Sequence, residues 1–382
     1  MQIEHKILCD EDRINFIRLA RTNGVGSATF FKLINEVENF SDIVKFSEEV
    51  FAKKSTKRPV KIASKDQIVK EIEDSEKFGA KIILITDEGY PELLRNIPDP
   101  PPVITVKGDE SLLDRDIIGI VGSRNASFHG ANYAKYLAKE LSKTGVVIAS
   151  GLAKGIDGVA HEAALQNGTI GVIAAGIDNV YPSQNKELFA KMSQKGLIIT
   201  EFAFGSSPKA SNFVQRNRII SGLSYGVVVV EAAIKSGSLT TARFANEQGR
   251  EVFAVPGFPS DSRSKGCNKL IDQGAVFLDD VEKIIEEIPT LRNNFRGDFV
   301  PIIRKFDQKE LKIVENQEEV AEDLDMDSIY GQICAKLGSV EISIEDLYEI
   351  FANNVQDVNI ALSELELEGK IEINGNRVVR LS

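Results

Sequence analysis

Apolar residues recur along the chain with two different periods, and the change of period predicts its elements. From residue 116 to 280, short apolar runs alternate with longer amphipathic segments. Runs such as 226–230 lack period-two alternation, which is typical of strands covered on both faces. The pattern predicts an α/β domain with a doubly wound, mostly parallel sheet. We expect strands at 117–121, 146–149, 169–174, 197–200, 226–231 and 251–255, and helices at 130–143, 157–167, 184–195, 212–223 and 238–248.

The N-terminal region, residues 1–64, has the pattern of a small helical domain. An apolar helix face ends near Arg21, and a glycine-bearing turn at 23–27 leads to a second helix at 28–37, with Ser27 as its expected N-cap. The turn is similar to that of a helix-hairpin-helix, and a plain helix turn is the alternative interpretation. Beyond it we expect a solvated basic loop at 53–59, a helix at 65–78 and strands at 81–86 and 103–106.

The C-terminal region predicts a linker and a small module. Residues 289–325 are polar with an acidic end, which is typical of a linker. Helices at 327–337, 343–352 and 355–369, followed by a hairpin at 371–379 with an Asn-Gly turn, suggest a winged-helix-like module. Its third helix is acidic, which favours protein contact or structural packing over DNA reading. The predicted domains are 1–64 (helical), 65–288 (α/β), 289–325 (linker) and 326–382 (winged-helix-like).

The charge distribution is more informative than the net charge of −11. Residues 101–290 hold 20 basic and 20 acidic residues, whereas residues 291–382 hold 10 and 19. The central domain is therefore free to form a basic groove. Three widely spaced cysteines, no apparent secretory signal and no apolar run long enough to span a bilayer predict a cytoplasmic protein.

Polar and glycine-bearing loops follow five of the predicted strands. The carboxyl ends of parallel strands share one edge of a sheet, and helix N-termini there attract anions. Arginine grips phosphate bidentately, and an aromatic ring offers a surface for base stacking. We therefore predict a site for a phosphate-bearing ligand. The candidate residues of this site are Gly122, Ser123, Arg124, Gly151, Lys154, Gly155, Asn185, Lys186, Asn212, Phe213, Arg216, Asn217, Arg218, Ser236, Gly237, Ser238 and Thr240.

The familiar catalytic motifs are absent from the sequence. It has no G-x-x-x-x-G-K-[ST] P-loop, and no G-x-G-x-x-G follows the first strand of the sheet. The three histidines show no metal-binding spacing, and His161 is expected to pack in the interior. Asp157 is a candidate N-cap, and Glu201 and Glu231 are expected to hydrogen-bond loop amides rather than to catalyse. We predict no catalytic residue, no metal and no cofactor.

Several of these stretches, in this order, closely resemble the DNA-processing protein A (DprA/Smf) family. The resemblance covers roughly residues 80–285. It is carried by Gly119-Ile120-Val121-Gly122-Ser123-Arg124, Ser150-Gly151-Leu152-Ala153-Lys154-Gly155-Ile156-Asp157, Ala174-Ala175-Gly176-Ile177-Asp178-Asn179-Val180-Tyr181-Pro182, Arg216-Asn217-Arg218-Ile219-Ile220-Ser221-Gly222-Leu223, Glu231-Ala232, Ser236-Gly237-Ser238-Leu239 and Phe253-Ala254-Val255-Pro256-Gly257.

The resemblance implies a Rossmann-like domain that binds single-stranded DNA without catalysis. It further implies homodimers, protection of incoming DNA, and loading of the RecA recombinase during natural transformation. Arg124 matches the family's pocket arginine, and Lys186 is the candidate for its pocket lysine. Two alternatives remain: a nucleotide-processing hydrolase of the lysine-decarboxylase-like phosphoribohydrolase type, and a structural scaffold whose arginines are salt-bridged.

Overall fold

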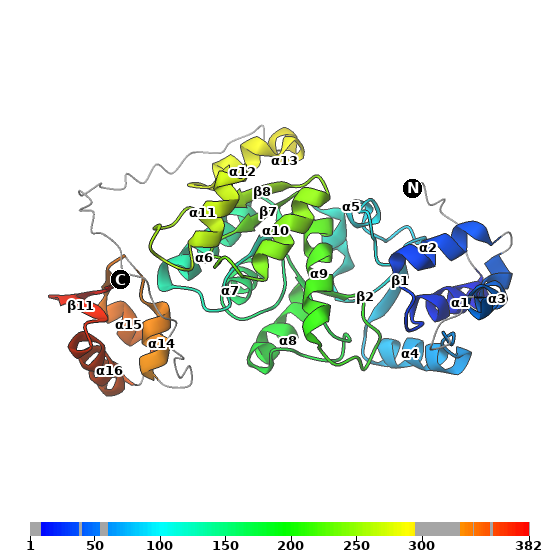
Figure 1. Cartoon of the computed structure of the whole chain (residues 1–382), viewed down its shortest axis with the longest axis horizontal. Helices are drawn as coiled ribbons and strands as arrows, with labels where there is room; N and C mark the ends of the chain where they lie inside the picture. The colour runs from blue at the N-terminus through cyan, green and yellow to red at the C-terminus, as the bar shows by residue number, and fades with distance from the viewer. Residues whose placement is uncertain are drawn as a thin grey trace.

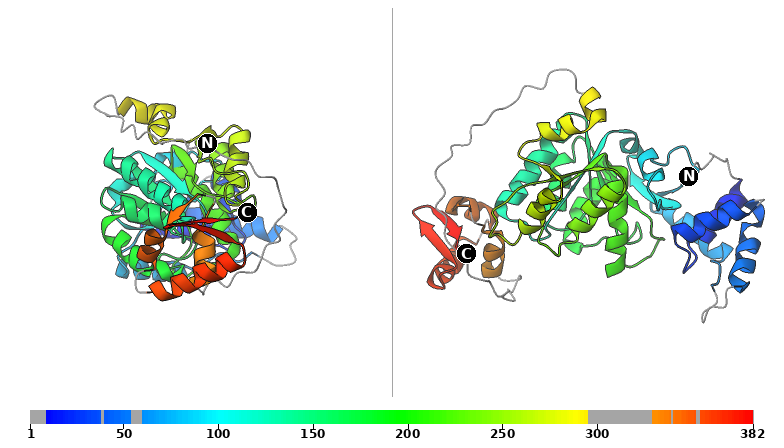
Figure 2. Two further views of the ribbon diagram at one scale, coloured as in Figure 1. Left: turned by 90° about the vertical axis from the view of Figure 1, so that its left-hand side faces the viewer. Right: turned by 45° about the horizontal axis from the view of Figure 1, so that its top comes forward.

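The computed structural model describes residues 9–37, 40–53, 60–294, 329–338, 340–351 and 354–381. A group of helices lies at one end of the molecule, an α/β body in the middle, and a small C-terminal module at the other end (Figures 1 and 2). No helix in these ranges has the length and apolar character needed to cross a membrane. The residues of the predicted site for a phosphate-bearing ligand lie in the α/β body.

The N-terminal helices pack around aromatic side chains. The rings of Phe16 and Phe30 meet edge to face with their centroids 4.8 Å apart. The predicted cap of the second helix is wrong: Gly26 is the N-cap, and Ser27 is the first helical residue. Most of the predicted basic loop lies outside the described residues. The elements are α1 (Asp10–Ala20), α2 (Ser27–Glu36), the 3-10 turn η1 (Phe40–Asp42), α3 (Ile43–Lys53) and α4 (Lys65–Lys77).

The body is built on a nine-stranded sheet with the order β1-β2-β6-β5-β4-β3-β7-β8-β9. The seven strands from β6 to β9 in that order are parallel, and β1 and β2 add an antiparallel edge. The mostly parallel sheet predicted from the sequence is therefore confirmed. The strands are β1 (Lys81–Leu84), β2 (Val103–Gly108), β3 (Ile117–Val121), β4 (Val147–Ser150), β5 (Thr169–Val172), β6 (Leu197–Thr200), β7 (Gly226–Val229), β8 (Glu251–Ala254) and β9 (Val276–Phe277).

Helices cover both faces of the sheet, as the central strand shows. Along β3, Ile117 and Val121 belong to the apolar cluster shared with α9 and α10, whereas Ile118 and Ile120 belong to the cluster shared with α6 and α7. Both sets are buried, which explains the absence of alternation in the sequence. The helices of the body are α5 (Glu92–Arg95), η2 (Glu110–Asp114), α6 (Phe128–Lys143), α7 (Ile156–Ala164), η3 (Ser183–Asn185), α8 (Lys186–Lys195), α9 (Ala210–Leu223), α10 (Ser238–Glu247), α11 (Lys265–Asp272), α12 (Glu282–Glu287) and α13 (Pro289–Asn294).

The first residues of the predicted linker, 289–294, form α13 and continue the helical body. Residues 295–328 lie outside the described ranges. The C-terminal module has its own apolar core. The predicted hairpin is confirmed, with Gly375 at a φ of 63° in its turn. The winged-helix arrangement stays a prediction. The elements are α14 (Ile329–Lys336), β10 (Ile342–Ser343), α15 (Ile344–Ile350), α16 (Val355–Leu367), β11 (Ile371–Asn374) and β12 (Arg377–Arg380), with the sheet order β10-β12-β11.

Candidate nucleic-acid interface

The loops after β3 and β4 lie against each other at the carboxyl edge of the sheet. The amide of Ile156 donates to the carbonyl oxygen of Ser123 at 3.2 Å. Gly155 has a φ of 73°, and a Cβ atom there would lie 2.3 Å from the Ser123 oxygen and 2.6 Å from the Arg124 oxygen. Only glycine allows this approach, because real Cβ atoms do not come within 3.0 Å of other heavy atoms. Gly155 therefore fixes the distance between the two loops.

This contact leaves a group of backbone donors without partners. The amides of Ser123, Arg124, Lys154 and Gly155 make no hydrogen bond within the part of the chain that the structure describes. The side chains of Arg124 and Lys154 are exposed beside them. Unpaired amides next to cationic side chains form an anion-binding surface. The two loops together thus have the donors and the charge to hold a phosphate.

Side chains hold the second loop from beneath. Leu152 is buried with a φ of 51°, a strained conformation for a leucine. Asp157 accepts from the amide of Gly151 at 3.0 Å and from that of Ala153 at 3.4 Å, and His161 accepts from the amide of Leu152 at 3.3 Å. The predicted capping role of Asp157 is therefore wrong, because it holds the loop and Gly155 occupies the N-cap position. The predicted packing of His161 is confirmed.

Asn185 completes this support, since its amide donates to the carbonyl oxygens of Leu152 and Ala153 at 2.9 and 3.0 Å. Burial lowers the pKa of His161 to about 3, so the ring is neutral. Burial raises the pKa of Asp157, while nearby Arg216 and the loop amides lower it. The strained loop is thus fixed by neutral and charged partners on three sides, which keeps Lys154 and its free amide in place.

An aromatic pair lies beside the first loop. The Arg124 guanidinium carbon lies 5.3 Å from the centroid of the Phe213 ring, and the Phe213 ring meets Tyr181 at a centroid distance of 5.5 Å and an interplanar angle of 60°. Tyr181 is 47% exposed, so the pair is open to solvent. Aromatic rings next to arginine are typical stacking surfaces for bases of single strands. Tyr181 was missing from the predicted site residues, although its loop follows β5 at the same edge.

A hollow of about 300 Å³ opens next to Arg124. It is lined by residues of the first two loops, of α6 and α7, and of the start of α8. Glu162 is the acidic residue of the lining. Lys336, from the C-terminal module, also lines it and was not predicted. The sequence carried no signal for Lys336, because that residue and Lys154 are 182 positions apart.

Two of the predicted arginines are internal. Arg218 is 3% exposed; its Nη2 lies 2.5 Å from Glu201 and its Nε lies 3.2 Å from Asp99. The predicted direct contact of Arg218 with DNA does not fit this geometry, because both carboxylates already hold the guanidinium. The expectation that Glu201 hydrogen-bonds loop amides is corrected as well, since its partner is Arg218. Burial raises the pKa of Glu201, and Arg218 opposes that rise.

Arg216 is 4% exposed and lies under the second loop. A Cβ atom on Gly151 would sit 1.7 Å from its Nη1, so Gly151 makes room for the guanidinium rather than for a ligand. Burial lowers the pKa of Arg216 to about 10, against the raising effect of Asp157, and Arg124 lowers it further. The predicted direct phosphate contact of Arg216 is therefore corrected, and its role is to place a positive charge beneath the loop.

The remaining predicted residues divide into structural and open ones. The structural role predicted for Glu231 is confirmed, since it accepts from the amide and hydroxyl of Ser127 at 2.9 and 2.5 Å.

Asn212 donates to the carbonyl oxygen of Ala174 at 3.2 Å. Several predicted residues make contacts within the protein: the Ser123 hydroxyl accepts from the Asn125 amide, Gly122 packs on Ile156, Asn217 donates to the Gly237 carbonyl oxygen, and Ser236 bonds to Ser238. Lys186 is exposed and Thr240 half-buried, with no hydrogen bond from either side chain among the described residues.

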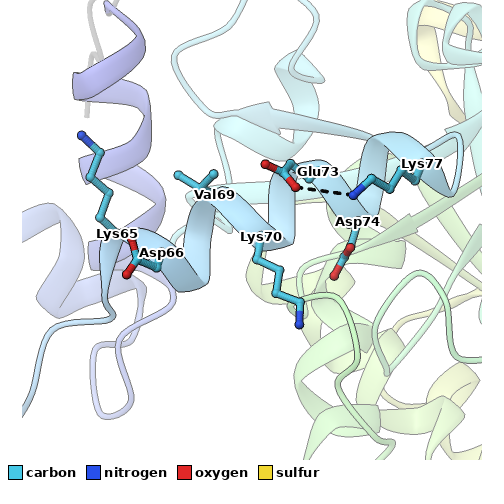
Figure 3. A pocket seen from close by; sticks show the side chains of 7 residues that line it. All are labelled: Lys65, Asp66, Val69, Lys70, Glu73, Asp74 and Lys77. Atoms are coloured by element: carbon cyan, nitrogen blue, oxygen red, sulfur yellow. Dashed lines mark hydrogen bonds and ion pairs between the residues drawn. The ribbon is translucent and has the colours of Figure 1, made fainter.

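A second hollow lies away from this edge, along α4, as Figure 3 shows. Its seven lining residues all come from that one helix. Lys65 is paired with Glu11, and Lys77 lies 3.4 Å from Glu73. Such alternating charge is typical of a solvated helix face. Within the described residues, no group of three or more histidines, cysteines or carboxylates has a metal-binding arrangement.

The fold and these loops define a Rossmann-like protein with an anion-receptive edge. Residues 81–289 match the family model of DNA recombination-mediator protein A, and residues 10–73 match that of the DprA-like N-terminal HHH domain. The chain therefore belongs to the DprA/Smf family, whose members are DNA-processing proteins.

Individual relatives agree with this assignment. The DNA processing protein DprA of Bacillus subtilis (strain 168) is 47% identical over 214 residues, which cover 55% of this chain and 72% of that protein. The X-ray structure of DNA processing protein A from Streptococcus pneumoniae has a TM-score of 0.61 and 34% identity, and covers 74% of this chain and 99% of its own. A structure of the Helicobacter pylori protein, described by its single-stranded DNA binding mode, has a TM-score of 0.52 and 31% identity, and covers 57% and 97%.

Proposed function

We propose that this chain binds single-stranded DNA at the carboxyl edge of its sheet, without catalysing a reaction. The single observation that carries the proposal is the group of four unpartnered amides on two touching loops, with Arg124 and Lys154 beside them. The exposed Tyr181–Phe213 pair supplies a surface on which a base can stack. The Helicobacter pylori relative, whose structure is described by its single-stranded DNA binding, supports the same ligand.

The proposed DNA contacts are made by the groups that are exposed at this edge of the sheet. Phosphates meet the free amides together with Arg124, Lys154 and Lys186, while bases stack on the aromatic pair. Two arginines act from the interior. Arg216 acts through its positive charge, and Arg218 acts through its ion pairs. Because phosphate contacts dominate, the binding is sequence-tolerant and weakens with salt.

The test is the affinity of Arg124→Ala for an oligothymidine, measured by fluorescence anisotropy across a salt series. Losing one charge-assisted phosphate contact weakens binding about tenfold and lowers the salt slope by about 0.7. Arg243→Ala is the matched control, since Arg243 is 61% exposed on α10 and pairs only weakly with Glu247 at 3.7 Å. Equal affinity of the Arg124→Ala variant and the wild-type protein, with unchanged melting, would remove Arg124 from the interface.

The hydrolase alternative has less support. Glu201 and Glu231 are both engaged by internal partners, so neither is placed to activate water. Incubation with AMP and chromatography for released adenine distinguishes the two functions. Release of free base above the rate of a buffer control argues for the hydrolase.

The cellular role follows from family membership. We propose that the protein protects incoming DNA, loads RecA onto it during natural transformation, and forms a homodimer. We also propose that its domains divide into a helical region at 1–64, an α/β body from 65 to the end of α13, a linker after α13, and a C-terminal module at 326–382. RecA filament formation on oligonucleotides coated with single-stranded DNA-binding protein, with and without this chain, tests loading. Sedimentation equilibrium tests the dimer.

A further inference from the structure

The C-terminal module is docked on the body at the start of α6. Phe128, the first residue of α6, packs against the apolar core of the module. Arg263 Nη2 donates to the carbonyl oxygen of Leu337 at 2.8 Å. The backbone of Val340 and Glu341 lies close to the His129 ring. Figure 1 shows α14 on the side of the module that faces the body. These contacts come from both apolar packing and hydrogen bonds, so they define one arrangement of the two parts.

This docking point is close in sequence to the first phosphate loop. Only three residues separate Arg124 from Phe128. Between them, Ser127 caps α6 by accepting from the amide of Gly130 at 2.9 Å, and Glu231 holds Ser127 to the end of β7. The position of the module is therefore coupled to the position of the Arg124 loop through a few rigid contacts.

The docked module places the last residue of α14 at the hollow. Lys336 lines it together with Arg124. The Lys336 side chain makes no hydrogen bond or ion pair with any residue that the structure describes. A partly buried ammonium group without a counter-ion is unfavourable, and burial lowers the pKa of Lys336 accordingly. An anion in the hollow would neutralise this charge.

The rest of the module makes this lysine distinctive. Residues 329–381 contain 4 basic and 9 acidic residues. Such a surface repels a polyanion over most of its area. Lys336 is the basic residue through which the module offers a strand in the hollow attraction instead of repulsion.

We propose that the docked C-terminal module supplies Lys336 as a phosphate contact for the same strand that Arg124 holds, so that the module forms one wall of the DNA-binding hollow. The inference rests on the proposed function, because it assigns a further residue to that site. Its ligand is the sugar–phosphate backbone, and it requires no base recognition by the module.

The test compares full-length Lys336→Ala with the wild-type protein, using an oligothymidine and fluorescence anisotropy at several salt concentrations. We expect about fivefold weaker binding and a salt slope lower by about 0.7. Lys370→Ala is the matched control: it removes a lysine of the same module that is paired with Glu368 at 3.1 Å and does not line the hollow. The control should bind as the wild type does.

A second variant separates direct contact from docking. Phe128→Ser removes the apolar anchor and releases the module, so Lys336→Ala should have no further effect in that background. An equal additional loss there would overturn the proposal, because the lysine would then act without the docked geometry.

The outcomes distinguish a failure of the Lys336 proposal from a failure of the proposed function. Unchanged or tighter binding by Lys336→Ala, with weakened binding by Arg124→Ala, overturns the role of Lys336 and leaves the proposed function standing. Unchanged binding by both variants removes the proposed site as well.

Discussion

Replacing Arg218 with methionine should destabilise the protein without removing its DNA contacts. Arg218 and Glu201 have side-chain exposures of 4% and 7%, so solvent screens their ion pair very little. Methionine keeps an unbranched apolar side chain but removes the guanidinium, which leaves Glu201 buried without its ion-pair partner. Breaking a buried pair in this way costs about 3–5 kcal/mol. The contact to Asp99 adds less, because that carboxylate is 52% exposed.

The loss is measured by urea unfolding followed by far-UV circular dichroism, since the chain has no tryptophan for fluorescence. With a slope of about 3 kcal/mol per molar urea, the midpoint should fall by about 1–1.7 M. Arg243→Met is the matched control and should stay within about 0.5 kcal/mol of the wild type, because Arg243 is exposed. The double variant Arg218→Met/Glu201→Leu should recover much of the loss by replacing the pair with apolar groups.

The opposite pattern would contradict the internal assignment of Arg218. If Arg218→Met unfolds at the wild-type urea concentration but binds oligothymidine as poorly as Arg124→Ala, then the guanidinium reaches the ligand in solution.

Three further changes test other parts of the site. Phe213→Leu should weaken oligothymidine binding by about 1–3 kcal/mol through lost stacking while leaving the salt slope unchanged, as anisotropy titrations would show. Gly155→Ala should lower the free energy of unfolding by at least about 2 kcal/mol and weaken DNA binding, because its Cβ would lie 2.3 Å from the Ser123 oxygen. His161 makes stability pH-dependent: its folded pKa of about 3 lies below the unfolded value of 6.5, so stability is full above pH 6.5 and falls as the pH drops, by about 2 kcal/mol at pH 5. His161→Gln should flatten that slope in urea unfolding at several pH values.

Each of these changes has a control or a contradicting result. Gly249→Ala shares a positive φ of 68° but meets nothing within 4 Å, so it isolates backbone strain from the loop contact. If Phe213→Leu lowered the salt slope but left the binding free energy otherwise unchanged, the ring would not stack on the bases of the strand. An unchanged acid slope in His161→Gln would mean that other groups titrate.

The sequence alone determined the fold of the body and the edge on which the site lies. Strands buried on both faces leave apolar runs without alternation, and each predicted strand and helix between residues 116 and 280 occurs within three residues of its expected bounds. The carboxyl ends of parallel strands must share an edge, so the sequence alone predicts that the loops bearing Arg124 and Lys154 lie together. Those loops touch in the structure.

Only the tertiary structure decided which charged groups face outward. Arg216 and Arg218 lie on the same helix as Phe213, but the packing of α9 buries both guanidinium groups. Helical spacing fixes the relative directions of these side chains, whereas their burial depends on neighbours such as Glu201 and Gly151 that are distant in sequence. For the same reason, the sequence did not predict Lys336 as a site residue. Its place beside Arg124 depends on a contact between two regions of the chain, and local residue patterns carry no information about such a contact.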